Sequence, residues 1–538
     1  MKSWIPHLLA IATVAFSAPT ASAGKSTVHG DLLASTTDWP SLQLQFKVKR
    51  NSMKIHGTSE FDVFANPVVS ADGVDVRYDG FAEFTQDSTL HRYTLVDGVA
   101  YYSSSAAADQ DQADQTSSST VQCLESDSLP PLHDIISALN DATLASNVTT
   151  PDGAITCSAG NFFRISFGGG TYALCASGSS GVDIYGSDLD IAIKYLNKTV
   201  GISAPKMNAG AKSECETIVN PTSVTATTVA LLTGEPTPES ESRGFFGISI
   251  SLTTPTCSCK STPRPCVFIH GLGIDYEEEE LQDSFSYYWG NMTEHAPCCT
   301  SFKYAIMDTV NNAWTNATQQ QKVCNHALAV SESSTKSVVA DTIIITHSMG
   351  GLTLAGAIAN GTCSLDKSTS WVATSAPMKG SMGSDFSQDS CDGENGGFMD
   401  SLADLLGQCP TNASVLSLAY ENGNNSSPEL NDAYVAAQQA YQTNVTAALC
   451  SDDYSGLVSI YQATYWAGGH LIPHNSPEND GMVEFQSCAG GLPMSDFGSN
   501  YRDKFYVTHL NHADTTFYNG DALFKVYKKP VKWFECLL

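Results

Sequence analysis

Apolar and polar side chains alternate along much of the chain between residues 30 and 230. Apolar residues occupy every second position of residues 42–48, and the same period returns over residues 189–195. Two further alternating runs, residues 163–167 and 172–174, flank the glycines at 168–170. A period of two is typical of strands that bury one face, and a short glycine-rich turn joins such strands into a hairpin. This region is therefore predicted to form an antiparallel sheet with one buried face.

The pattern changes after Cys266 to continuous apolar runs separated by helical stretches. Helices are predicted at residues 319–330 and 349–359, and buried strands precede and follow them. Strands that alternate with helices in this way are typical of a mostly parallel sheet with helices on both faces. The predicted strands cover residues 267–269, 342–346, 371–374 and 458–465.

The change from alternating strands to strands separated by helices predicts two domains. The length of 538 residues predicts the same, because a single hydrophobic core stops growing near roughly 250–300 residues. Residues 234–242 are polar and contain two prolines, as expected of a linker. Residues 103–120 are rich in Ser, Ala, Asp and Gln and are predicted to be a disordered surface loop. The predicted organisation is a signal peptide at 1–23, a β-rich domain of unknown role at 24–233, a linker at 234–245 and an α/β catalytic domain at 246–538.

The first residues fit a cleaved secretory signal better than a membrane anchor. Lys2 supplies a positive charge, residues 8–16 are apolar, and Ala21-Ser22-Ala23 forms a small-residue cleavage site. A membrane anchor would need about 20 apolar residues, and this run is shorter. No later segment fits a membrane span or a glycolipid anchor signal, so we expect a secreted, extracellular protein.

The cysteines and glycosylation motifs agree with an extracellular location. Of 16 cysteines, four lie before residue 216 and twelve from residue 257 onward, which predicts disulfides within each domain. No Cys/His cluster has zinc spacing, so neither a metal site nor a cofactor is expected. Asn-x-Ser/Thr acceptors for glycosylation occur at Asn147, Asn197, Asn291, Asn316, Asn360, Asn412, Asn424, Asn425 and Asn444.

The charge balance excludes one class of partner. There are 27 Lys and Arg residues against 56 Asp and Glu residues, a formal net charge of -29. Such an acidic surface repels phosphate backbones and anionic lipid headgroups, so nucleic acid is not an expected partner.

The strongest chemical signal follows the predicted strand at residues 342–346. His347-Ser348-Met349 makes a tight turn there, and glycines at 350 and 351 open a helix. A serine raised on such a turn is a nucleophile elbow, and the N–H of Met349 at the helix start would stabilise an oxyanion. A His-Gly turn at 270–271 ends an earlier strand and would point the N–H of Leu272 at the same oxyanion. The alternative is a serine that only caps the helix.

These segments resemble the lipase and esterase branch of the α/β-hydrolase superfamily. The resemblance extends from about Cys266 to the C-terminus and includes residues 369–381, which are similar to the strand and turn after the elbow. It implies an α/β-hydrolase domain with a triad of Ser348, Asp480 and His512, and the oxyanion hole at Leu272 and Met349. The order Ser, Asp, His along the chain is that of the family.

Two positions depart from the family pattern. Thr346 stands where the elbow motif has its first glycine, and Met378 stands where a histidine often follows the proline. Alternatives also remain for two triad members: His509, His470 and His474 for the base, and Asp514 and Glu484 for the acid.

The predicted function is a secreted serine hydrolase that cleaves carboxylic esters of lipid-like small molecules through an acyl-enzyme on Ser348. The alternatives are a non-catalytic binding or structural protein on a hydrolase shell, and glycosylphosphatidylinositol inositol-deacylase-like, acyltransferase or peptidase activity through the same triad. The β-rich half resembles no family. Its strands fit a concave sheet, which would bind lipid or glycan, cover the active site or only aid folding.

Overall fold

The structure is a computed structural model that describes residues 39–106, 120–126, 128, 132–151, 153–157, 161–207, 215–237, 248–253, 256–392 and 409–538. The predicted signal peptide, most of the predicted loop at 103–120 and the second part of the predicted linker lie outside these residues. None of the described helices combines the length and hydrophobicity needed to cross a bilayer.

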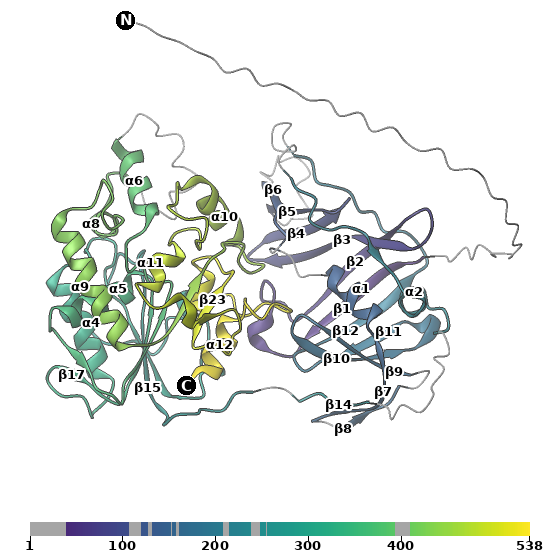
Figure 1. Ribbon diagram of the computed structural model, residues 1–538, viewed down its shortest axis with the longest axis horizontal. Helices are drawn as coiled ribbons and strands as arrows, with labels where there is room; N and C mark the ends of the chain where they lie inside the picture. The colour runs from purple at the N-terminus through teal and green to yellow at the C-terminus, as the bar shows by residue number, and fades with distance from the viewer. Residues whose placement is uncertain are drawn as a thin grey trace, which may run out of the picture. The chain divides into compact units, whose positions relative to one another are not determined.

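The first region is a large sheet whose neighbouring strands are antiparallel, apart from the parallel pair β14 and β7. Its main order is β14-β7-β9-β10-β11-β12-β1-β2-β3-β4-β5-β6, with β8 beside β7 and β13 beside β3. Figure 1 draws these strands in purple to blue. The strands are β1 (Ser41–Val48), β2 (Glu60–Val69), β3 (Asp75–Gln86), β4 (Thr89–Val96), β5 (Val99–Ala106), β6 (Thr120–Leu124), β7 (Thr143–Thr150), β8 (Gly153–Ile155), β9 (Phe162–Phe167), β10 (Gly170–Ala176), β11 (Val182–Tyr185), β12 (Leu189–Leu196), β13 (Thr222–Ser223) and β14 (Ile248–Ser251).

The period of two predicted this sheet correctly. In β1 the side chains of Leu42, Leu44 and Phe46 are buried, and they share one core with the helices α1 (Leu132–Asn140) and α2 (Ala226–Thr233). The predicted hairpin is confirmed, since β9 and β10 pair antiparallel across the glycine turn. Antiparallel strands with one face on helices and one face outward need alternating residues, which the sequence provides.

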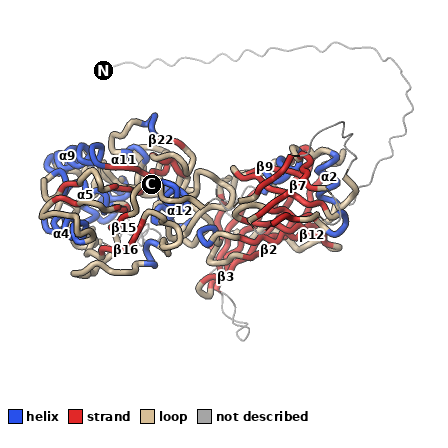
Figure 2. Tube along the Cα trace, turned by 90° about the horizontal axis from the view of Figure 1, so that it is seen from below, coloured by secondary structure: helices blue, strands red, loops and turns tan. Residues whose placement is uncertain are grey.

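The second region is a sheet in the order β16-β15-β18-β20-β21-β23-β22, and every neighbouring pair in it is parallel. A separate short pair, β17 and β19, lies outside it. Figure 2 shows helices and strands mixed in this region, whereas strands dominate the first. The strands are β15 (Arg264–Ile269), β16 (Cys299–Ala305), β17 (Val338–Val339), β18 (Ile343–His347), β19 (Ser364–Leu365), β20 (Ser370–Thr374), β21 (Val445–Ser451), β22 (Phe497–Gly498) and β23 (Phe505–Thr508).

Both faces of the parallel sheet are covered. Ile344 of β18 packs into a core with α4, α5 and α9, whereas Ile343 and Ile345 pack into a second core with α3 and α12. The continuous apolar runs are explained by this double burial. The helices are α3 (Ser286–Trp289), α4 (Ala317–Ala329), α5 (Met349–Ala359), α6 (Met382–Asp392), α8 (Ala413–Leu416), α9 (Pro428–Asn444), α10 (Gln462–Leu471), α11 (Phe485–Ala489) and α12 (Pro530–Leu537).

One predicted strand is wrong. Residues 458–465 form a turn followed by the start of α10, and the sheet strand of this region is β21 at Val445–Ser451 instead. The apolar side chains of this segment contact two different parts of the protein. Val458 and Ala463 pack on the core of the first sheet, and Tyr465 lines a pocket of the second region. A short apolar run cannot by itself distinguish a strand from a buried helix.

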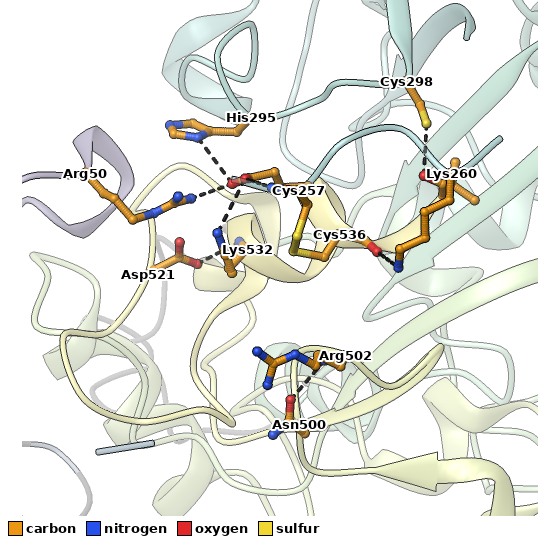
Figure 3. Close-up of a disulfide and its surroundings, with 12 residues drawn as sticks. Arg50, Cys257, Lys260, His295, Cys298, Asn500, Arg502, Asp521, Lys532 and Cys536 are labelled. Atoms are coloured by element: carbon orange, nitrogen blue, oxygen red, sulfur yellow. Dashed lines mark hydrogen bonds and ion pairs between the residues drawn. A yellow bond between two sulfur atoms is a disulfide. The ribbon is translucent and has the colours of Figure 1, made fainter. Parts of the chain in front are cut away.

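The predicted separation of the disulfides is confirmed. The first four cysteines pair as Cys123–Cys215 and Cys157–Cys175, and no described cysteine is free. In the second region Cys257 is bonded to Cys536 of α12, next to Arg50 and Lys532 (Figure 3). The remaining bonds are Cys259–Cys298, Cys266–Cys299, Cys324–Cys363, Cys391–Cys409 and Cys450–Cys488.

The residues from Trp39 to Leu538 form one compact unit. β14, which follows the predicted linker, pairs with β7 of the first sheet. The domain boundaries at 24–233, 234–245 and 246–538 remain predictions.

Candidate active site

Ser348 occupies the single residue between β18 and α5. Its backbone angles are φ 52° and ψ -132°, in a region that residues other than glycine rarely adopt. The backbone N–H of Ser348 donates to the carbonyl of Thr374 on β20 at 2.9 Å, which holds the turn against the neighbouring strand. A strained residue that the surrounding structure holds in place is common at reactive sites.

The residues around the turn explain how the sharp bend is accommodated. A Cβ atom at Gly350 would collide with the carbonyl oxygen of His270, so glycine is needed where α5 starts. Thr346, which departs from the family pattern, is fully buried, and its hydroxyl accepts a hydrogen bond of 2.9 Å from the indole N–H of Trp371. The threonine side chain therefore has a partner of its own and fits the elbow.

Ser348, His512 and Asp480 form a hydrogen-bonded chain. The Ser348 hydroxyl lies 2.9 Å from Nε2 of His512, and Nδ1 of His512 lies 2.7 Å from Oδ2 of Asp480. Because a carboxylate only accepts, Nδ1 carries the proton and Nε2 is left to accept one from the serine. The other carboxylate oxygen of Asp480 accepts the backbone N–H groups of Met482 and Val483 at 3.0 and 2.7 Å.

The alternative histidines and acids have other partners. His509 lies 3.5 Å from Asp452, and His474 lies 2.8 Å from the buried Glu484. Asp514 accepts the N–H of Leu457 at 2.6 Å, and burial raises its pKa to about 6. His470 lies at the end of α10, against the ring of Trp466.

The two predicted oxyanion donors belong to segments that adjoin the serine. Met349 is the first residue of α5, and the first N–H groups of a helix have no acceptor within it. Leu272 lines the same pocket as Ser348. The loop that carries Leu272 is held through the N–H of Gly271, which donates to the hydroxyl of Tyr288 at 2.8 Å.

Tyr288 was not predicted from the sequence, and it joins the loop to the histidine segment. Its hydroxyl lies 2.6 Å from Nδ1 of His347, whose Nε2 lies 3.1 Å from the carbonyl oxygen of His512. The carbonyl can only accept, so His347 donates from Nε2 and accepts the Tyr288 proton at Nδ1. Tyr288 comes from α3, a helix of four residues with no motif that could have revealed it.

Burial favours the neutral forms of the histidine and tyrosine side chains around this turn. Burial, together with the neighbouring His512, holds the pKa of His347 well below its usual value. Burial also lowers the pKa of His270 to about 4 and raises that of Tyr288. Neutral donors and acceptors hold these side chains in position without placing a second charge beside His512.

The site opens into a pocket of about 240 Å³ that contains Ser348 and His512. Among the described residues, no group of three His, Cys, Asp or Glu side chains is placed to hold a metal ion. The remaining lining is mostly aromatic and aliphatic and includes Leu272, Tyr287, Leu418, Tyr461, Tyr465, Met482, Val483 and Tyr518.

No family model and no curated protein matches the chain. Among solved structures, a lipase of Staphylococcus hyicus is similar at 14% identity and a TM-score of 0.27, over 51% of this chain and 95% of the lipase chain. Prolyl oligopeptidase B of Galerina marginata is similar at 10% identity and a TM-score of 0.19, over 85% of this chain and 64% of the other. TM-scores this low do not establish a shared fold, so the chemistry must follow from the side chains of this chain.

Proposed function

We propose that the chain is a secreted serine hydrolase with an α/β-hydrolase domain, and that it cleaves carboxylic esters through an acyl-enzyme on Ser348. The observation that supports this proposal is the hydrogen-bonded chain from Asp480 through His512 to Ser348, located where a parallel strand turns into a helix. A serine hydroxyl is a weak nucleophile unless a neighbouring base takes its proton, and that arrangement supplies the base.

In the proposed first half-reaction Oγ of Ser348 attacks the carbonyl carbon while its proton passes to Nε2 of His512. The imidazolium is stabilised by Asp480, which stays ionised. As the tetrahedral intermediate collapses, the carbon–oxygen bond to the alcohol breaks and His512 returns the proton to the leaving oxygen. In the second half-reaction water, deprotonated by His512, attacks the acyl-enzyme, and Ser348 is released with its proton restored.

The oxyanion formed at each step carries a full negative charge on the former carbonyl oxygen. The N–H groups of Met349 and Leu272 are the proposed donors for it. Fixed donors in a site that excludes water stabilise such a charge more than solvent does, because they need no reorganisation during the reaction.

The lining of the pocket supports an acyl group as the part of the substrate bound beside Ser348. Aliphatic and aromatic side chains make up most of its wall, and its volume of about 240 Å³ suits a short or medium chain. The disulfides support secretion, because they form and persist in oxidising compartments.

The test uses p-nitrophenyl esters of graded chain length and a fluorophosphonate probe on the secreted protein. We expect hydrolysis to rise from acetate to octanoate, and Ser348→Ala to lower kcat by at least about 10⁴-fold and to abolish labelling. Ser333→Ala, which changes an exposed serine elsewhere on the surface, is the matched control and should behave as the parent. Labelling that persists in Ser348→Ala would place the nucleophile elsewhere.

A further inference from the structure

A second cavity lies inside the first region, under the inner face of β1 to β4. It measures about 130 Å³, and none of its lining residues is shared with the pocket at Ser348. Its wall also includes residues of α1 and α2 and two residues from the second region, Val458 and Leu523. Its apolar lining includes Leu44, Phe61, Val63, Ile135 and Leu232.

Small side chains on two adjacent strands create the space. Ala65 of β2 is paired with Gly80 of β3, and Val63 is paired with Ala82 two residues along. Further along β3 the inward-facing residue is Phe84, which packs edge-on to Phe61. At this part of β2 and β3 the inward-facing positions are occupied by a glycine and alanines. Elsewhere on these strands the inward-facing positions hold large side chains, so the cavity lies where the side chains are small.

One polar atom of the lining has no partner. The hydroxyl oxygen of Tyr78 is buried and makes no hydrogen bond to any residue that the structure describes. Burial, with a smaller contribution from Tyr195, raises the pKa of Tyr78, as expected of a hydroxyl surrounded by protein. Tyr78 is a lining residue of the cavity, and buried hydroxyl groups are nearly always satisfied, so its unpartnered hydroxyl is the donor to which a ligand would offer an acceptor.

The charges around the cavity favour a neutral ligand. Arg77 also lines it, but its guanidinium is held by Asp97 at 2.6 Å and by Asp79 at 3.4 Å. The chain as a whole carries a formal charge of -29. Among the described lining residues a carboxylate would meet no uncommitted cation, whereas an alcohol or ester oxygen needs only the Tyr78 hydroxyl.

We propose that this cavity binds a single neutral acyl-chain lipid, or the end of a longer one, with its oxygen accepting a hydrogen bond from Tyr78. An apolar cavity of roughly 150 Å³ takes up benzene, so the cavity of about 130 Å³ here holds a chain segment of about six carbons at most. The exposed residues Ser126 and Asn220 lie among the lining residues and mark its rim. Such a ligand buries its chain against aliphatic and aromatic walls and is oriented by one polar contact, as is usual for small-molecule sites.

The experiment uses the full chain carrying Ser348→Ala, so that binding is measured without turnover. The probe is 1-octanol, titrated by calorimetry, together with a photoreactive octanol whose labelled peptides are mapped by mass spectrometry. We expect labelling of peptides from β1 to β4 and saturable binding. Tyr78→Phe should weaken that binding about fivefold, the effect of one neutral hydrogen bond, and octanoate should bind more weakly than octanol.

Ala82→Phe fills the cavity and should remove octanol binding in the first region. Its matched control is Thr85→Phe on the same strand, where the side chain is exposed and outside the lining, and where binding should be unchanged. Labelling confined to peptides around Ser348, or parental affinity in both Ala82→Phe and Tyr78→Phe, would overturn the proposal. Because no ester is cleaved in this experiment, its result does not depend on the proposed hydrolase activity.

Discussion

Replacing Tyr288 by phenylalanine removes one buried hydroxyl on which two loops of the candidate site depend. The hydroxyl accepts the N–H of Gly271 at 2.8 Å and donates to Nδ1 of His347 at 2.6 Å. His347 in turn donates a hydrogen bond from Nε2 to the backbone carbonyl of His512. The substitution keeps the ring and its packing, so the change is confined to these hydrogen bonds.

The expected loss of stability follows from the groups left without a partner. Tyr288→Phe leaves the backbone N–H of Gly271 and the imidazole acceptor of His347 without a hydrogen-bond partner, and both groups are buried. Each buried unsatisfied group costs about 1–3 kcal/mol, and some relaxation is expected, so the free energy of unfolding should fall by about 2–4 kcal/mol. The loop with Leu272 would also lose its anchor, and a displacement of about 1 Å can lower a rate about 100-fold.

The assay measures kcat and KM on a p-nitrophenyl ester, together with unfolding in urea. We expect kcat to fall more than KM rises, because the oxyanion donors act mainly in the transition state. Tyr287→Phe is the stability control, since the hydroxyl of Tyr287 bonds to that of Tyr276 in an exposed position. The unfolding free energy of this variant should change by less than about 0.5 kcal/mol. Parental kcat and parental stability in Tyr288→Phe would refute the reasoning.

Three further predictions concern other residues. His512→Ala should remove nearly all ester hydrolysis and His509→Ala should leave most of it, and the reverse result would reassign the base. Arg50→Met leaves the buried carboxylate of Glu535 without its closest cation, so urea unfolding should show a loss of about 3–5 kcal/mol. Burial lowers the pKa of His56 from 6.5 to about 4. As the pH falls, this histidine is therefore protonated in the unfolded chain before it is protonated in the folded one. The free energy of unfolding should fall by about 3 kcal/mol between about pH 6.5 and pH 4. His56→Asn should flatten that dependence in unfolding measured across the pH range, and an unchanged slope would contradict the assignment.

Features that depend on local period were predictable from the sequence. The strands at residues 42–48 and the hairpin at 163–174 were found because every second residue is apolar, and this signal needs no knowledge of the partner strand. The segment at 458–465 shows the limit. Its apolar residues contact two different parts of the chain, so their spacing follows neither the strand nor the helix period.

The candidate triad was located from short motifs, because each of its members lies in a segment with its own pattern. Tyr288 and the role of His347 were missed, since their hydrogen bond joins α3 to the end of β18 across 59 positions of sequence. The cavity under the first sheet was also missed. It depends on the register that places Ala65 beside Gly80, and register cannot be read from one strand alone.

The two regions depend on each other through the segment that follows His512. Leu523 and Phe524 of that segment are buried in the core of the first sheet. At the hairpin turn of that sheet Gly168 has φ +57°, and a Cβ atom there would lie 2.5 Å from Phe524, so the turn and the phenylalanine are in close contact. The chain then returns to the second region in α12. The histidine segment is thereby fixed at one end by Asp480, which accepts the N–H of His512 at 2.9 Å through its backbone carbonyl, and at the other by the first sheet. If the β-rich half only covered the site, it would not need to hold the segment that follows His512. Because Leu523 and Phe524 of this segment pack in its core, we expect the β-rich half to help position the proposed base.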